Sequence, residues 1–157
     1  MRERTLRSFL YFVAGIGLIV SLFAAAEILD SALGAVCTVN SFVSCGKVAS
    51  SGLTTTLEVP DYLWGIGGFV LILVVAALAE QRPDDRRRTY ALLSVTTLGV
   101  VLAGYLLYVE LAEIHALCLV CATAYVLSGF AWVGAIALAR RPPDDAGEPA
   151  VESDEEP

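Results

Sequence analysis

The sequence predicts an all-α membrane protein in which four transmembrane helices form one bundle. Hydrophobic residues make up 57% of the 157 residues, and the mean hydropathy is +0.70, which is far too apolar for a soluble domain. A helix needs roughly 20 mostly apolar residues to cross about 30 Å of hydrocarbon, so each long uncharged stretch can span a bilayer. The chain has such stretches at residues 8–26, 62–79, 90–109 and 117–139.

The first stretch follows the basic segment MRERTLR and contains small residues at positions 24–26, so a cleaved signal peptide is an alternative. Its uncharged run exceeds the roughly 7 to 15 residues of a signal-peptide core, and we expect it to remain as the first span. The next connection, residues 27–59, is the longest between two stretches, and long connections usually carry function. We expect its SSGLTTTLEVP portion to form a short element that lies along the interface and caps the bundle, and we expect the loop or a short interfacial helix to cover the site.

Prolines and acidic residues mark the other spans. Pro60 and Asp61 suit a helix start, because proline fits the first turn and a carboxylate complements the positive N-terminal end. Pro83 interrupts the short connection QRPDDRRRT, so the second and third spans form an antiparallel hairpin. The expected domain is residues 1–141, with spans at about 8–28, 61–80, 90–110 and 117–139.

The basic residues predict the orientation of the spans. Four spans place nine arginines on one side of the membrane and only Lys47 on the other, and basic residues favour the cytoplasmic side. We expect a multi-pass protein of the plasma membrane with both termini in the cytoplasm. The arginines are Arg2, Arg4, Arg7, Arg82, Arg86, Arg87, Arg88, Arg140 and Arg141.

Much of the net charge of −7 lies in residues 142–157, which combine many acidic residues with prolines and few apolar ones. This composition is typical of disorder. We expect a disordered acidic cytoplasmic tail, and we expect no nucleic acid as a partner.

The four cysteines are predicted to lie at one face of the membrane. Cys37 and Cys45 belong to the long extracytoplasmic loop, and Cys118 and Cys121 form a Cys-x-x-Cys pair in the first turn of the fourth span. Residues three apart on a helix share a face, so this pair can close an exchangeable disulfide, and a helix N-terminus favours the thiolate. Two pairs on an oxidising surface indicate an electron relay.

Two other interpretations of the cysteines are weaker. The first is a non-enzymatic tetraspan scaffold with two static disulfides, and the second is a zinc site, which would need stable thiolates in an oxidising setting. The sequence contains no glycine-rich dinucleotide loop, P-loop or haem ligand pair. Because the Cys-x-x-Cys opens into the bilayer, a lipid-soluble quinone is the expected electron acceptor, without a metal.

Three motifs resemble the vitamin K epoxide reductase family in its prokaryotic form. The loop reads CTVNSFVSCGKVASS, in which two cysteines are separated by seven residues and Ser51 follows six positions later. VPDYLWGIGG at the second span and LCLVCATAY at the fourth complete the similarity, which covers about residues 7–139. A DsbB-type oxidase carries its Cys-x-x-Cys in the first periplasmic loop, so the order of the cysteine pairs favours the former family.

The resemblance implies a four-helix bundle around a quinone of the menaquinone, ubiquinone or vitamin K type. Electrons would pass from a separate thioredoxin-like or DsbA-like protein to Cys37 and Cys45, and then to Cys118 and Cys121. Cys118 would exchange with Cys45, Cys121 would face the quinone, and Ser51 would support the loop pair. Net oxidation of secreted thiols would follow.

The resemblance also implies two quinone-binding side chains. Tyr125 lies one turn after Cys121 and would donate a hydrogen bond to a quinone carbonyl. The family commonly has asparagine where this chain has Asp61, which could donate only when protonated and could instead cap its helix. The single histidine, His115, lies three residues before Cys118 and is expected to be a bystander rather than a proton shuttle.

Overall fold

The computed structural model describes residues 2–29, 37, 39–51, 55–56, 59–81 and 86–140. The expected acidic tail lies outside the described residues. Long helices dominate the described part of the chain, and short elements connect them at one end. In chain order the elements are α1 (Arg2–Leu29), α3 (Cys45–Ser50), β1 (Thr55–Thr56), β2 (Val59–Pro60), α4 (Asp61–Gln81), α5 (Arg86–Val109), the π-helix η1 (Glu110–Ile114) and α6 (Leu119–Ala139).

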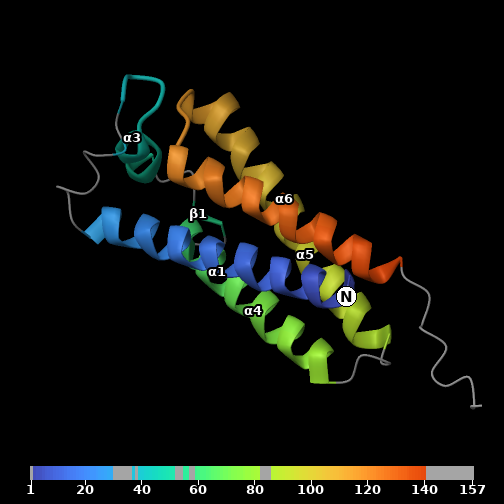
Figure 1. Ribbon diagram of the computed structural model, residues 1–157. Coiled ribbons are helices and arrows are strands. Elements are labelled where there is room, and N and C mark those ends of the chain that lie inside the picture. The colour runs from blue at the N-terminus through green and yellow to red at the C-terminus, as the bar shows by residue number, and fades with distance from the viewer. Residues whose placement is uncertain are drawn as a thin grey trace, which may run out of the picture.

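The prediction of an all-α bundle with four transmembrane helices is confirmed. The described residues contain four helical stretches long and apolar enough to cross a membrane, with mean hydropathies from 1.8 to 2.3. Helix α1 packs against α4 and α6, and α5 packs against the same two helices, which closes a ring of four (Figure 1). The chain is therefore a multi-pass membrane protein.

Two helices extend further than expected. Helix α1 begins at Arg2 and ends at Leu29, beyond the expected span at about residues 8–28, so Glu27 belongs to a helix although it follows the uncharged stretch. Helix α5 begins at Arg86, and η1 continues it to Ile114. A charged residue near the end of a span need not terminate a helix, because its side chain can reach the interface or find a partner inside the bundle.

The loop elements form a cap at one end of the bundle (Figure 1). The short helix α3 lies directly before most of the SSGLTTTLEVP segment, because Ser44 caps its start by accepting a hydrogen bond from the Lys47 N–H. Within the segment itself, β1 and β2 pair as two-residue antiparallel strands. The β-branched Thr55, Thr56 and Val59 suit such extended backbone.

The end of the bundle away from the cap is held by apolar side chains that we call the apolar cluster. Small residues allow close helix approach here: an added Cβ at Gly17 of α1 would overlap the ring of Phe69 on α4. Close backbone approach at small residues is typical of helices that associate in membranes. The buried members of the cluster are Leu10, Val13, Ala14, Phe69, Ile72, Leu92, Ala131 and Ala135.

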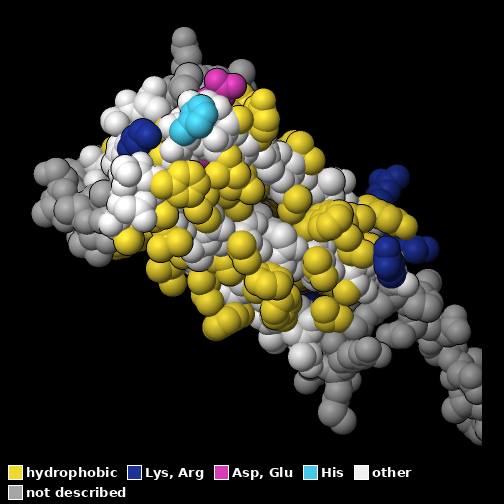
Figure 2. Space-filling model, turned by 90° about the horizontal axis from the view of Figure 1, so that it is seen from above, with side chains coloured by type: hydrophobic (Ala, Val, Ile, Leu, Met, Phe, Trp, Pro, Cys, Tyr) yellow, Lys and Arg dark blue, Asp and Glu magenta, His cyan; other side chains and the backbone are white. Residues whose placement is uncertain are grey.

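The surface also fits a membrane protein. Figure 2 shows a broad hydrophobic face, with Lys and Arg side chains at one end and the histidine close to a basic and an acidic side chain at the other. Many large apolar side chains on the four long helices are exposed, including Phe12, Leu98 and Val133. In the bilayer these side chains face lipid, so their exposure carries no free-energy penalty.

Candidate active site

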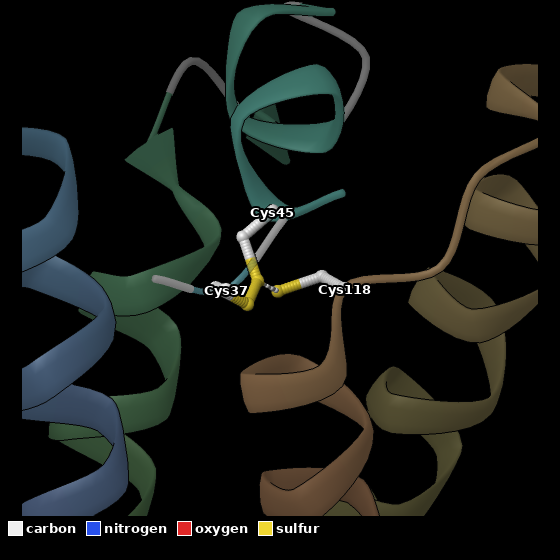
Figure 3. A group of neighbouring side chains, drawn as sticks. All are labelled: Cys37, Cys45 and Cys118. Carbon is white, nitrogen blue, oxygen red and sulfur yellow. Dashed lines mark hydrogen bonds between the residues drawn. A yellow bond between two sulfur atoms is a disulfide. The ribbon is translucent and has the colours of Figure 1, made fainter. Parts of the chain in front are cut away.

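Three sulfur atoms meet beneath the cap, and we call Cys37, Cys45 and Cys118 the sulfur cluster. Cys37 and Cys45 form a disulfide with their Cα atoms 5.6 Å apart, and Cys118 is a free thiol. The Cys118 Sγ lies 3.3 Å from the Cys45 Sγ and points toward the disulfide (Figure 3). All three side chains are at most 8% exposed. The arrangement places a thiol against a disulfide in a largely water-free site.

Backbone hydrogen bonds hold the two cysteine-bearing segments together. Val43 and Leu117 form a parallel bridge, in which the Leu117 N–H donates to the Phe42 carbonyl over 2.8 Å. The Ser44 N–H donates to the Leu117 carbonyl over 3.2 Å. Because the bridge ends directly before Cys45 and Cys118, it places the two sulfur atoms side by side, although the residues are far apart in sequence.

The Cys-x-x-Cys pair lies at the start of α6, but Cys118 precedes the helix instead of lying within its first turn. Its backbone is extended, with φ −88° and ψ 114°, and its Sγ accepts a hydrogen bond from the Cys121 N–H. This is the geometry of a helix N-cap, with sulfur in the place of the usual oxygen. Cys121 is also a free thiol, and it is half-buried.

A buried carboxyl group, Glu110, connects the site residues. Its Oε2 accepts a hydrogen bond from the Cys118 N–H over 3.0 Å, and its Oε1 accepts one from the Tyr125 hydroxyl over 2.8 Å. The Cys121 side chain is a third neighbour of the carboxyl group. Glu110 has no exposed surface. It therefore touches both cysteines of the motif and the tyrosine one turn deeper.

Glu110 was not among the site residues expected from the sequence, where it was only the last residue of the third span. Two signals could have identified it. It is an acidic residue at the end of a long uncharged run, and ionisable residues inside spans are functional by default. It also begins η1, and π-helical turns within helices are frequent at functional sites, but this turn is visible only in the structure.

A cavity of about 140 Å³ opens between the four helices next to these residues. Apolar side chains from α1, α4, α5 and α6 form most of its wall, and Cys121 and Tyr125 face it from α6. Asp61 lines it as the first residue of α4, where its Oδ1 also accepts a hydrogen bond from the Tyr62 N–H. Asp61 thus binds a backbone N–H at the start of α4 and borders the cavity.

Glu27 lines the same cavity from α1. It is 8% exposed, and its Oε1 has no hydrogen-bond partner among the described residues. Together with Asp61 and Tyr125 it supplies the cavity with polar groups on three helices. A mostly apolar cavity with a few polar groups is typical of a binding site for a small organic ligand.

Ser51 and His115 take different places from the cavity residues. Ser51 ends α3, and its hydroxyl donates to the Val48 carbonyl over 2.7 Å, so it stabilises the helix that carries Cys45. His115 ends η1 in the left-handed conformation, with φ 53°, and its exposed ring lies beside the Glu113 carbonyl oxygen. This position fits the bystander role expected for His115.

The three sulfur atoms of the sulfur cluster all lie within 4.8 Å of one another, a spacing that could suit a metal ion. Thiolates are the form of cysteine that binds metals, and two of these sulfur atoms are joined in a disulfide. Metal binding by this group would therefore require reduction of the disulfide first.

Residues 8–136 match the sequence model described as "Vitamin K epoxide reductase family". The matched range covers most of the chain and contains all four cysteines, Asp61, Glu110 and Tyr125. The match therefore includes every residue that borders the sulfur cluster or contributes a polar side chain to the cavity.

Proposed function

Because the chain belongs to the vitamin K epoxide reductase family, whose members are membrane thiol oxidoreductases, we propose that it oxidises thiols of secreted proteins and passes the electrons to a quinone. The observation that carries the proposal is the 3.3 Å separation between the Cys118 thiol and the Cys45 sulfur. Disulfide exchange requires a thiolate to attack a disulfide sulfur, and this contact supplies both partners.

The exchange step balances as follows. A Cys118 thiolate attacks Cys45 Sγ, a Cys45–Cys118 disulfide forms, and Cys37 leaves as a thiolate. In the oxidase direction the same bond is made from the other side: a Cys45 thiolate attacks Cys118 in a Cys118–Cys121 disulfide, and Cys121 leaves. Attack by Cys37 on Cys45 then releases Cys118, so the loop pair ends oxidised and the Cys-x-x-Cys pair ends as two thiols.

The described arrangement matches the state after this transfer, with the loop pair joined and the Cys-x-x-Cys pair reduced. A quinone supplies an acceptor for two electrons and two protons when Cys118 and Cys121 are reoxidised. The cavity fits such a group, because it is mostly apolar, lies against Cys121 and carries polar side chains at Asp61 and Tyr125. Tyr125 and Asp61 would hold its oxygens.

The electron donor in this proposal is a separate thioredoxin-like or DsbA-like protein that reduces Cys37–Cys45. Val39 and Phe42 lie close to Cys37 in sequence and are 71% and 50% exposed, which would offer an apolar contact beside the disulfide. The side of the membrane follows from the arginines, and we assign the sulfur cluster to the extracytoplasmic face of the plasma membrane, with both termini in the cytoplasm. This topology includes the four spans expected from the sequence and places the expected acidic tail in the cytoplasm.

Two variants test the relay. Cys121→Ala should reduce quinone no faster than protein-free vesicles, because no terminal disulfide can form. In Cys45→Ala, the Cys37 thiolate should attack the disulfide of an oxidised thioredoxin-like protein, release one of its cysteines as a thiolate and stay bound to the other, because no Cys45 remains to attack Cys37. Non-reducing electrophoresis and mass spectrometry would detect this mixed disulfide. A static scaffold predicts neither result: if wild-type protein reduces no quinone and Cys37 traps no thiol protein, the scaffold interpretation replaces the oxidase.

A further inference from the structure

We propose that Glu110 carries protons from the Cys121 thiol to the Tyr125 hydroxyl while Cys118 and Cys121 are oxidised. This inference rests on the proposed quinone reduction. Glu110 lies within the third span and has no exposed surface, although a buried carboxyl group is costly unless it has partners or a function. The bundle nevertheless keeps this carboxyl group buried in the middle of the redox site, which indicates a function for it.

Glu110 has as neighbours both the side chain that releases the proton and the side chain that receives it. The Cys121 thiol, the source of a proton, and the Tyr125 hydroxyl both border the cavity, whereas Glu110 is not part of the cavity wall. Tyr125 donates its hydroxyl hydrogen to Glu110 Oε1 over 2.8 Å. In this arrangement the tyrosine has no hydrogen to offer toward the cavity, because its single O–H is already used.

Protonation of Glu110 would reverse this hydrogen bond. An ionised carboxylate only accepts hydrogen bonds, but a protonated carboxyl group has an O–H to donate. Once Glu110 takes the proton of Cys121, it can donate to the Tyr125 oxygen, and Tyr125 can turn its own O–H into the cavity. The order of proton movement is therefore Cys121 to Glu110, Tyr125 to the cavity, and Glu110 to Tyr125.

The step balances with the electron transfer. Oxidation of two thiols to one disulfide releases two electrons and two protons, and a quinone takes up all four as it becomes a quinol. Each passage ends with Glu110 as a carboxylate and Tyr125 as a phenol. The regenerated carboxylate can then take the second proton, which leaves the Cys118 thiol. The Cys118 backbone N–H bound to Glu110 Oε2 keeps the two residues adjacent.

Three substitutions at position 110 separate proton transfer from positioning. Glu110→Gln keeps the side-chain length: its amide oxygen can accept from the Cys118 N–H and its amide group can donate to the Tyr125 oxygen, but it cannot carry a proton. Glu110→Asp keeps a carboxyl group on a shorter side chain. Glu113→Gln, on the exposed face of the same π-helix, is the matched control.

We expect the single-turnover rate of quinone reduction to be highest in wild type, lower in Glu110→Asp and lowest in Glu110→Gln. Loss of a proton-transferring side chain lowers a reaction rate by about 10²-fold or more. Glu110→Gln should therefore reduce quinone at least that much more slowly than wild type, with a larger solvent deuterium isotope effect. Quinone affinity, and quinone-free exchange between Cys45 and Cys118, should stay near wild type. Glu113→Gln should match wild type throughout.

Several outcomes would overturn the proposal. If the Glu110→Gln variant reduces quinone at the wild-type rate, or faster than the Glu110→Asp variant, Glu110 only positions its neighbours. An equal loss in quinone-free exchange would lead to the same conclusion. If wild-type protein reduces no quinone, both the proposed function and the proton route fail. If wild type and Glu110→Gln reduce quinone equally well, only the proton route fails.

Discussion

The two ends of the bundle use buried space in opposite ways. At one end, the apolar cluster brings α1, α4, α5 and α6 together through side chains such as Leu10, Phe69 and Leu92, which make only van der Waals contacts. At the other end, the buried groups are a disulfide, a thiol and a carboxyl group, joined by directional contacts of 2.8 to 3.3 Å. Both ends are buried, yet only one can exchange bonds or protons.

The difference indicates how a small membrane protein can combine stability with chemistry. Packing of apolar side chains tolerates no charge but needs no exact hydrogen-bond geometry, so it can hold the helices together. The redox end instead depends on partners that satisfy each buried polar group. Substitutions at the two ends should therefore separate stability from activity.

The largest effect on activity is expected at Cys118. Cys118→Ser should lower quinone reduction to the background rate, because serine cannot form the exchange disulfide. Its hydroxyl can still accept from the Cys121 N–H as a helix N-cap, so the melting temperature should change by only a few degrees. Activity above background, measured in vesicles with a soluble dithiol donor, would contradict the assigned role.

A matched pair of tyrosines tests whether similar hydrogen bonds differ in function. Tyr125→Phe removes the bond to Glu110 and the expected proton donor to quinone, and should slow quinone reduction by about 10²-fold or more, as for other proton-transferring side chains. Tyr11→Phe removes an exposed 2.9 Å bond to Glu80 at the apolar end and should leave the rate unchanged. Equal rates for both variants would remove the distinction.

The smallest effect on activity, with the clearest loss of stability, is expected at Leu10, which is 1% exposed. Leu10→Ala should lower the unfolding free energy by about 2 kcal/mol, the low end for such truncations, because lipid solvates the freed surface but the packing contacts are lost. Leu22→Ala, on the lipid-facing side of the same helix and 50% exposed, is the control. Detergent-titrated unfolding should separate the two, and equal losses would argue against the apolar cluster as the stabilising core.

Local patterns in the sequence predicted most of the fold, because a bilayer demands long uncharged helices. The spans followed from charge-free runs, and the start of α4 followed from Pro60 and Asp61. The position of α3 did not follow from the sequence, since its start depends on a Ser44 cap that competes with many similar polar residues in the loop. The N-terminal extension of α1 to Arg2 was not expected, because the charged residues before residue 8 were counted as flanking the span and not as part of a helix.

The chemistry divides in the same way. The sequence by itself determined that four cysteines lie in two pairs, and its motifs indicated the family to which the chain belongs. Only the tertiary structure decided that Cys118 lies against Cys45 and that Glu110 joins Cys118, Cys121 and Tyr125. The physical reason is range: helix formation and membrane insertion are set by neighbouring residues, whereas these contacts join α3, η1 and α6 across the bundle.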